Sequence, residues 1–273
     1  MTSARVASHR ITRVSGRARE TLEDSVAVER ALEIRVDGRA LAVTLCTPGH
    51  DAELALGFLA GEGLIQRRAD AASITERAAD CADQPDAIEI TLAPGTRFDW
   101  TRLERHFAAT AACGLCGRAH LESLRAGLTV IPPGPPLDPA AIASLPERLR
   151  EAQSTFLATG GLHAAAYCAG ETLVLQVLRE DVGRHNAVDK VAGWLVNQGR
   201  HPANQGVLWV SGRAGAEIAL KATRARIPAL AAVGAPSTLA IEIAEAAGLT
   251  LIGFLREGRM NVYSGMERIA AAP

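Results

Sequence analysis

The sequence predicts an α/β protein with a smaller α+β N-terminal domain and a larger α/β C-terminal domain. Three observations support this fold class. In the C-terminal half, short apolar runs alternate with helical stretches, which is typical of a mainly parallel sheet covered by helices. In the N-terminal half, Asp37-Gly38 connects two apolar strands. Between the halves, residues 131–139 hold five of the thirteen prolines.

Length and composition fit this architecture and exclude several classes of protein. The 273 residues are 48% hydrophobic and 22% charged, so the chain can bury a core and is not disordered or fibrous. The formal net charge of −1 gives no general attraction to nucleic acid or anionic membranes. No apolar run reaches the roughly 18 residues of a membrane span. We therefore expect neither nucleic acid nor a membrane as a partner.

Cysteine usage indicates a reducing compartment. The five cysteines are odd in number and mostly scattered, which does not fit a secreted disulfide framework. We therefore expect a cytoplasmic protein. Apart from one close pair, the cysteines are expected to be small core residues, namely Cys46, Cys81 and Cys168.

The N-terminal elements follow from turn signals and apolar spacing. Residues 1–19 are basic, contain no acid and lack a secretory signal's apolar segment, so we expect a flexible tail. Within the domain at 20–131, strands at 31–36 and 40–45 flank Asp37-Gly38, because a type I′ turn needs positive φ at both central residues. Further along the chain, the spacing predicts a helix at 51–59, a strand at 87–92 and a helix at 98–109.

The proline-rich residues 132–139 are predicted to be an extended connector, because they cannot continue a helix or a central strand. The C-terminal domain then spans 140–273. Its predicted strands are 173–178, 207–210, 230–233 and 249–254, and its predicted helices are about 185–197, 214–225 and 239–247.

Four loops follow these strands and would lie together at one edge of the sheet, where ligands of such folds bind. Three of them lead into helices, whose first backbone N–H groups lack partners and suit phosphate. The loops favour an anionic ligand about as strongly as they favour ordinary helix capping. They are residues 180–186, 211–215, 234–238 and 256–261, and their arginines are Arg184, Arg213, Arg256 and Arg259.

The sharpest local motif is Cys113-Gly-Leu-Cys116 with its adjoining glycines. Two cysteines at this spacing can form a reversible disulfide, provide half of a metal site, or supply an activated thiolate that accepts and passes on sulfur. No second CxxC exists, so a structural zinc would need scattered ligands such as Cys81, Cys168 or His163. The residues alone leave these three chemistries open.

His163 ends a second motif, Thr159-Gly-Gly-Leu-His163. Zinc-dependent base deaminases combine His-x-Glu with a downstream Pro-Cys-x-x-Cys motif. Here Ala165 stands at the glutamate position and the cysteine pair lies upstream, so the sequence argues against deaminase chemistry. His163 is either a packed, hydrogen-bonding residue or a ligand-binding one.

Residues 179–190 place seven charged or histidine side chains at a predicted strand-to-helix junction. This density is too high for an uninterrupted core helix. Asp181 precedes the helix, so Asp181, His185 and Lys190 cannot share one exposed helix face. His185 titrates near neutrality and can therefore relay a proton.

At these motifs the sequence resembles the FdhD family, the sulfurtransferases required for formate dehydrogenase maturation, over nearly the whole chain after residue 19. Six ordered motifs at compatible spacing carry the resemblance. They are Thr47-Pro-Gly-His-Asp-Ala-Glu-Leu-Ala-Leu-Gly-Phe-Leu-Ala-Gly-Glu-Gly63, Cys113-Gly-Leu-Cys-Gly117, Thr159-Gly-Gly-Leu-His163, Glu180-Asp-Val-Gly-Arg-His-Asn186 with Asp189-Lys190, Ser211-Gly-Arg213, and Gly253-Phe254 leading to Asn261-Val-Tyr263.

The resemblance implies a homodimeric cytoplasmic protein with a cytidine-deaminase-like, three-layer C-terminal domain. It implies that persulfide sulfur is taken from a cysteine desulfurase and passed to the molybdenum bis(molybdopterin guanine dinucleotide) cofactor of formate dehydrogenase. Cys113 matches the persulfide carrier, Cys116 supports transfer, and no resident metal is expected. The family's cofactor-binding stretch corresponds to Phe254, Leu255, Arg256, Glu257, Gly258 and Arg259. The predicted binding set also includes His163, Asp181, Arg184, His185, Ser211 and Arg213.

This sequence departs from the family pattern near several motifs. Ala111-Ala112 stand where relatives often have two serines, and Gly215 and Gly234 stand where serines are expected. Two other functions remain compatible with the cysteine pair. These are a CxxC dithiol oxidoreductase and a non-enzymatic molybdenum-cofactor chaperone.

Overall fold

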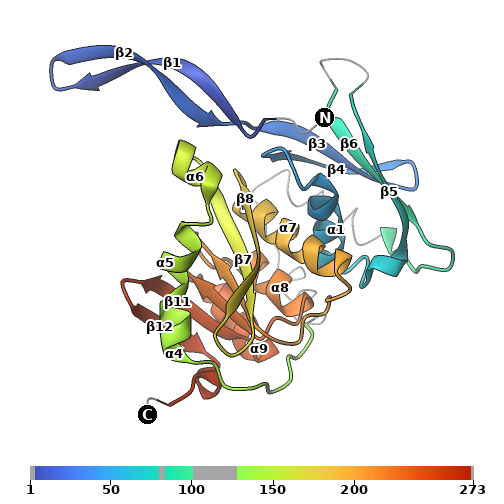
Figure 1. The fold of residues 1–273 in the computed structure, drawn as a ribbon. Coiled ribbons are helices and arrows are strands. Elements are labelled where there is room, and N and C mark those ends of the chain that lie inside the picture. The colour runs from blue at the N-terminus through green and yellow to red at the C-terminus, as the bar shows by residue number, and fades with distance from the viewer. Residues whose placement is uncertain (1–3, 80–83, 101–127, 272–273) are drawn as a thin grey trace.

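The computed structural model describes residues 4–79, 84–100 and 128–271 of the chain (Figure 1). Within these ranges the chain forms three sheets with helices, which confirms the predicted α/β class. Cys81, the Cys113–Cys116 motif and most of the helix predicted at 98–109 lie outside the described residues. The cytidine-deaminase-like detail stays a prediction.

The first sheet is a two-stranded antiparallel arm, β1 (Val6–Ser15) and β2 (Ala18–Ala27), which projects from the rest of the molecule (Figure 1). It replaces the flexible tail that residues 1–19 predict. The basic residues of β1 face acidic residues of β2, as in the Arg10–Glu23 pair, whose Nε and Oε1 atoms lie 3.4 Å apart. Opposite charges across a strand pair stabilise it. The basic segment is therefore ordered because it pairs with acidic residues of β2, which lie after residue 19.

The second sheet has the strand order β4-β3-β6-β5. Its strands are β3 (Arg30–Val36), β4 (Arg39–Cys46), β5 (Ala71–Arg77) and β6 (Asp86–Leu92). The predicted hairpin is confirmed, because Asp37 and Gly38 have φ angles of 47° and 79°. The predicted helix is confirmed as α1 (Asp51–Gly61), whose buried leucines pack with this sheet. Strand β5, which follows the short 3-10 turn Arg68–Asp70, was not predicted.

The third sheet has six strands in the order β12-β11-β10-β9-β7-β8. They are β7 (His163–Ala169), β8 (Val174–Asp181), β9 (Val207–Val210), β10 (Ala229–Ala232), β11 (Thr250–Arg256) and β12 (Arg259–Ser264). The four predicted strands, β8 to β11, share one direction. Two strands that were not predicted, β7 and β12, run the opposite way, so the sheet is mixed and not mainly parallel.

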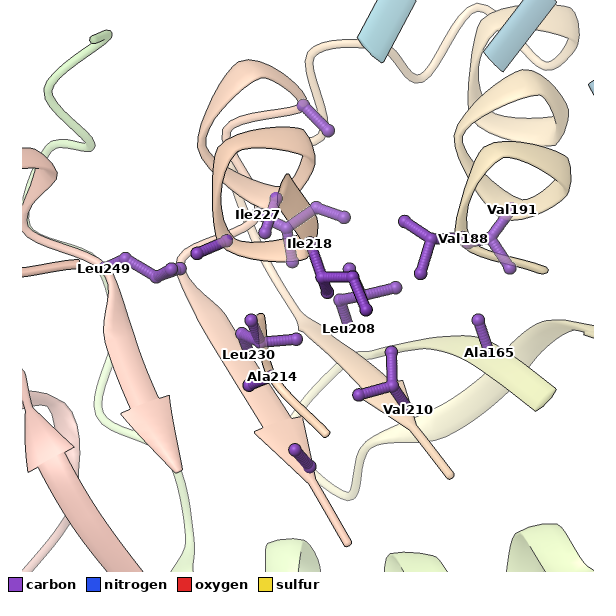
Figure 2. Close-up of a cluster of buried hydrophobic side chains, with 14 of the residues drawn as sticks. Ala165, Val188, Val191, Leu208, Val210, Ala214, Ile218, Ile227, Leu230 and Leu249 are labelled. Atoms are coloured by element: carbon purple, nitrogen blue, oxygen red, sulfur yellow. The ribbon is translucent and has the colours of Figure 1, made fainter. Parts of the chain in front are cut away.

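Helices cover both faces of the third sheet. On one face lie the three predicted helices, α7 (Arg184–Asn197), α8 (Ala216–Arg224) and α9 (Thr238–Ala247). Figure 2 shows their apolar side chains, such as Val188 and Ile218, beside Leu208 and Leu230 of the sheet. The other face packs against α4 (Pro139–Ala143) and α5 (Leu145–Arg150), and α6 (Ser154–Thr159) follows. No helix in the described ranges is long and apolar enough to cross a membrane.

Arg268, in the short 3-10 turn Met266–Arg268, attaches the proline-rich connector to the third sheet. Of the predicted connector at 132–139, residues 132–136 have no regular secondary structure, whereas Leu137 forms a β-bridge with Ile269 and Pro139 begins α4. The Arg268 guanidinium donates hydrogen bonds to the carbonyl oxygens of Pro132 and Gly248 and to Thr250 Oγ1. The connector is therefore extended and held along its path.

The N-terminal and C-terminal parts meet where α1 crosses α7. A Cβ added to Gly57 would lie 1.7 Å from the carbonyl oxygen of Asp189, and a Cβ added to Gly193 would lie 1.8 Å from that of Glu53. Real Cβ atoms do not approach so closely, so each helix needs a glycine where it meets the backbone of the other. The two halves on either side of the connector are therefore packed backbone to backbone.

We predict that Gly57→Ala lowers the free energy of unfolding by about 3 kcal/mol, because the added methyl group forces the two helix backbones apart. Gly134→Ala is the control, since a Cβ at Gly134 meets nothing within 4 Å. The control should change stability by less than about 1 kcal/mol. Urea unfolding followed by circular dichroism measures both, and equal losses would contradict the prediction.

Candidate functional site

The carboxyl ends of β8, β9, β10 and β11 lie at one edge of the third sheet. Hydrogen bonds connect this edge: the Gly234 amide donates to the Gly212 carbonyl at 2.9 Å, and the amide of Phe254, within β11, donates to the Gly234 carbonyl at 3.1 Å. His163 begins β7 opposite Asp181, at the end of β8. These contacts bring together the loops after β9 and β10, the end of β11 and the end of β8. The loop predicted at 256–261 is corrected: it is the β11–β12 hairpin, in which Arg256 ends one strand and Arg259 begins the next.

Gly234 and Gly253 allow these loops to approach one another. A Cβ on Gly234 would lie 3.0 Å from the Gly212 carbonyl oxygen, and one on Gly253 would lie 2.8 Å from Pro236 Cδ. A serine at position 234, as the family pattern suggests, would crowd this contact. Gly234, which departs from the family pattern, therefore allows the close packing of these two loops in this chain.

Ser211 fixes the position of His163 through the backbone of the next residue. The Ala164 amide donates to Ser211 Oγ at 2.9 Å, and the Ser211 amide donates to the Ala164 carbonyl at the same distance. Burial, assisted by the nearby Arg184, lowers the pKa of the half-buried His163. His163 is therefore a neutral imidazole at pH 7, and the Ser211 hydroxyl already accepts a backbone hydrogen bond.

The N-termini of α7 and α8 open at this edge without side-chain caps. Their N-cap residues are Gly183 and Gly215, and a Cβ at Gly215 would meet nothing within 4 Å. In contrast, Ser237 caps α9 by accepting a hydrogen bond from the Ala240 amide. The first N–H groups of α7 and α8 are therefore the ones available to an anion.

Arginines supply positive charge around these helix ends. Arg184 lies half-buried in the first turn of α7, and Arg213 and Arg256 are exposed. None of the three forms an ion pair within the described part of the chain. Arg259 contacts Glu257 at 2.7 Å on the exposed turn between β11 and β12. The edge thus combines uncapped amides with guanidinium groups, an arrangement that suits a phosphate-bearing ligand.

Phe254 and Leu255 are neighbours in the predicted cofactor-binding stretch but occupy different environments. Phe254 has a φ of 51° at an irregularity in the pairing of β11 with β12, and its side chain is 37% exposed. A bulky residue in the left-handed region is strained, and such strain is typical of ligand sites. Leu255 is fully buried in the core. Of the two side chains, only Phe254 is available to a ligand.

Comparisons with known proteins show which family the chain belongs to. Residues 27–270 match the model of the FdhD/NarQ family. The chain belongs to this family. It is 46% identical over 268 residues to the sulfur carrier protein FdhD of Mycolicibacterium paratuberculosis, covering 95% of this chain and 97% of that protein. It is 45% identical over 267 residues to the protein of the same name from Streptomyces avermitilis, covering 96% and 94%.

A crystal structure shows the same fold. It is that of a protein from Desulfotalea psychrophila assigned as a formate dehydrogenase accessory protein. The TM-score is 0.78 at 22% sequence identity, and the match covers 98% of this chain and all of that one. The arm, the second sheet and the third sheet therefore form an arrangement that a distant sequence also adopts.

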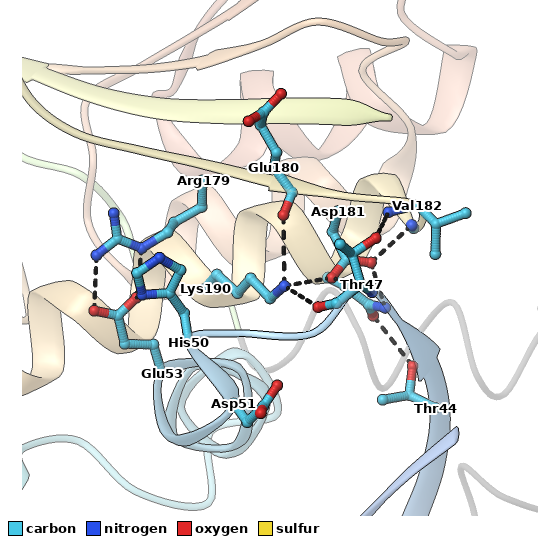
Figure 3. Close-up of polar contacts among 12 residues, drawn as sticks. Thr44, Thr47, His50, Asp51, Glu53, Arg179, Glu180, Asp181, Val182 and Lys190 are labelled. Atoms are coloured by element: carbon cyan, nitrogen blue, oxygen red, sulfur yellow. Dashed lines mark hydrogen bonds and ion pairs between the residues drawn. The ribbon is translucent and has the colours of Figure 1, made fainter. Parts of the chain in front are cut away.

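In this FdhD/NarQ family member, Asp181 belongs to a buried charge network and not to the surface of the site (Figure 3). Its Oδ2 lies 2.6 Å from Lys190 Nζ, and the two side chains are 0% and 1% exposed. The Asp181 carboxylate also accepts hydrogen bonds from the amides of Thr47 and Gly183 and from Asn186 Nδ2. The predicted contact between Asp181 and a ligand is corrected accordingly: the side chain is inaccessible and holds the loop between β8 and α7.

Lys190 connects the same loop to the N-terminal part. Its Nζ donates to the Thr47 carbonyl at 2.8 Å and to the Glu180 carbonyl at 3.4 Å, in addition to its ion pair with Asp181. The Thr47 hydroxyl accepts from the Val182 amide. Thr47 lies in a family motif, but the sequence predicted no role for it, because its partners lie more than 130 residues away.

A bidentate pair extends this interface along α1. Arg179 Nε and Nη2 donate to the two carboxylate oxygens of Glu53 at 2.6 and 2.8 Å (Figure 3). His50 Nδ1 lies 3.5 Å from Glu53 Oε2. Burial and then Arg179 lower the pKa of His50 to about 4, so this imidazole is neutral at pH 7.

Two cysteines lie within the described residues, and both are buried. Burial raises the pKa of Cys46 to about 12 and that of Cys168 to about 11. Both are therefore protonated at pH 7 and poor nucleophiles. The described part of the chain contains no group of three or more His, Cys, Asp or Glu side chains that could hold a metal ion.

We predict that Lys190→Met lowers the free energy of unfolding by about 3–5 kcal/mol, because it leaves the Asp181 carboxylate buried without its cation. The double variant Asp181→Asn, Lys190→Met removes the uncompensated charge and should recover part of this loss. Chemical denaturation of the wild type and of both variants provides the test. A double variant as unstable as Lys190→Met alone would show that the ion pair is not the cause.

Proposed function

We propose that this protein is a sulfur carrier in formate dehydrogenase maturation. It takes persulfide sulfur from a cysteine desulfurase and passes it to the molybdenum bis(molybdopterin guanine dinucleotide) cofactor. The observation that carries the proposal is the nearly full-length similarity to relatives named sulfur carrier protein FdhD. The client enzyme is inferred from the accessory protein of the same fold.

Cys113 is the proposed carrier of sulfur. Its thiolate attacks the outer sulfur of the desulfurase persulfide, a new S–S bond forms, and the bond to the desulfurase cysteine breaks to release that thiolate. Cys116 then attacks Cys113 Sγ, which forms the Cys113–Cys116 disulfide and releases the outer sulfur as hydrosulfide with the electron pair. A cellular dithiol reduces the disulfide before the next cycle.

The sheet edge is the proposed site for the acceptor, which is a substrate and not a resident cofactor. Its phosphate groups fit the uncapped amides of α7 and α8 together with Arg184 and Arg213. The exposed ring of Phe254 offers a surface on which a guanine or pterin ring can stack. Positive charge, open amides and an aromatic face thus occur together at one edge.

The first test loads the protein with cysteine desulfurase and cysteine and measures the gain in mass. We expect about one sulfur mass on Cys113 in wild-type protein and none after Cys113→Ala, because the carrier thiolate is missing. Cys46 and Cys168 serve as internal controls, since burial keeps both protonated. Loading of Cys113→Ala at the wild-type level would overturn the proposal. A reversible disulfide that turns over substrate without sulfur gain would support the oxidoreductase alternative.

The second test measures binding of guanosine diphosphate by calorimetry. We predict that Arg184→Ala and Arg213→Ala each weaken binding about tenfold, which corresponds to one lost charge-assisted hydrogen bond. Arg150→Ala is the control, because Arg150 is exposed on α5 at the opposite face of the sheet. The affinity of the wild type should also fall with added salt. An equal loss in all three variants would argue against a phosphate site at this edge.

A further inference from the structure

His185, in the first turn of α7, contacts Glu217 in the first turn of α8. The distance from His185 Nε2 to Glu217 Oε2 is 3.1 Å, and the side chains are 34% and 50% exposed. Both helices begin at the carboxyl edge of the third sheet, so the pair lies at the proposed acceptor site. The other ring nitrogen, Nδ1, has no hydrogen-bond partner among the described residues.

The charged groups that face His185 come from three elements. Arg184 belongs to α7 itself, Lys221 to α8, and His163 to β7. Burial is the main cause that lowers the pKa of His185, and these three groups lower it further. Among the groups that act on this ring, Glu217 is the one that favours protonation. The basicity of His185 at this site therefore depends on one carboxylate.

A second ion pair lies one helical turn further along the two helices. Asp189 follows His185 by four residues and Lys221 follows Glu217 by four, so the two pairs connect the same faces of α7 and α8. Lys221 Nζ lies 2.6 Å from Asp189 Oδ1, and both side chains are buried. This inner pair links α7 to α8 one turn beyond the contact between His185 and Glu217.

We propose that Glu217 is a positioning residue that holds His185 at Nε2 and makes Nδ1 the base for sulfur delivery. The inference deepens the proposed function and rests on it. The hydrosulfide sulfur bonds to the acceptor in place of a water ligand, which leaves with its own electron pair. The S–H bond breaks, its electron pair stays on sulfur, and His185 Nδ1 takes the proton. The imidazolium then forms an ion pair with Glu217 and later returns its proton to water.

The first experiment titrates His185 by NMR, with its signal assigned from a His185→Asn spectrum. Glu217→Gln keeps the size of a half-exposed side chain, so the variant should fold. We expect the pKa of His185 to fall in Glu217→Gln, because the only favourable charge is lost. Glu245→Gln, which removes an exposed carboxylate on α9, should leave the titration unchanged. An unaltered His185 titration in Glu217→Gln would overturn the inference.

The second experiment follows sulfur delivery from preloaded protein in a single turnover at several pH values. In Glu217→Gln we expect the rate at pH 7 to fall about tenfold, because a misplaced and weaker base removes the proton. The acidic limb of the profile should move to lower pH, since His185 loses its proton earlier. Loading of Cys113 and binding of guanosine diphosphate should stay at the wild-type level.

Failure of sulfur carriage and failure of the role of Glu217 give different results. If wild-type protein does not load sulfur on Cys113, the proposed function fails, and the delivery step fails with it. If wild-type protein loads and delivers sulfur but Glu217→Gln shows the same pH profile and rate, the role of Glu217 alone is overturned. A slow Glu217→Gln with an unshifted profile would indicate a structural defect and would also contradict the inference.

Discussion

The crossing of α1 over α7 is the contact on which the rest of the molecule depends. Because Gly57 and Gly193 let the helix backbones touch, the loop before α1 lies beside the loop between β8 and α7. Thr47 can then complete the hydrogen bonding of the buried Asp181–Lys190 pair. A buried ion pair is favourable only when its remaining donors and acceptors are satisfied. The N-terminal part therefore determines where the α7 N-terminus lies.

The distribution of cations follows from the same requirement. The chain contains only two lysines, Lys190 and Lys221, and both are buried in ion pairs at 2.6 Å. A compact ammonium group with three donors suits Lys190, which faces a carboxylate and two carbonyl oxygens. Arginines carry the charge at the sheet edge, where planar guanidinium groups can bind phosphate in a bidentate manner. Buried positive charge is thus structural, and exposed positive charge is available to a ligand.

The sequence predicted those elements whose apolar periodicity is regular. Strands β8 to β11 and helices α7 to α9 were found because short apolar runs alternate with helical stretches. Strand β7, which reads His-Ala-Ala-Ala-Tyr-Cys-Ala, was missed because alanine favours helices. Its small side chains are explained by tertiary packing, since Ala164 and Ala166 share a core cluster with the large Trp209. That constraint is invisible in the local pattern.

Some of the binding residues could be predicted from the local sequence, and others could not. Loop position and charge placed Arg184 and Arg213 at the sheet edge, and the family resemblance placed Phe254 there. All three have side chains that are at least partly accessible. Asp181 was assigned to a ligand because it lies in the charged loop predicted at 180–186. Its partner Thr47 precedes it by 134 residues, so the local sequence did not show that the carboxylate is already paired. Glu217 gave no signal, because its importance comes from the packing of α8 beside α7. The local sequence pattern therefore did not show which side chains are buried or which residues pair over long distances in the sequence.

The mixed topology of the third sheet explains why histidines lie among the arginines of the edge. Strand β7 runs against its neighbours β8 and β9, so its first residue, His163, stands where the other strands end. Helix α7 begins at the same edge and places His185 nearby. Burial and the adjacent Arg184 keep both imidazoles mostly neutral at pH 7. Guanidinium groups therefore supply the permanent charge, which leaves the histidines free to exchange protons close to a bound anion.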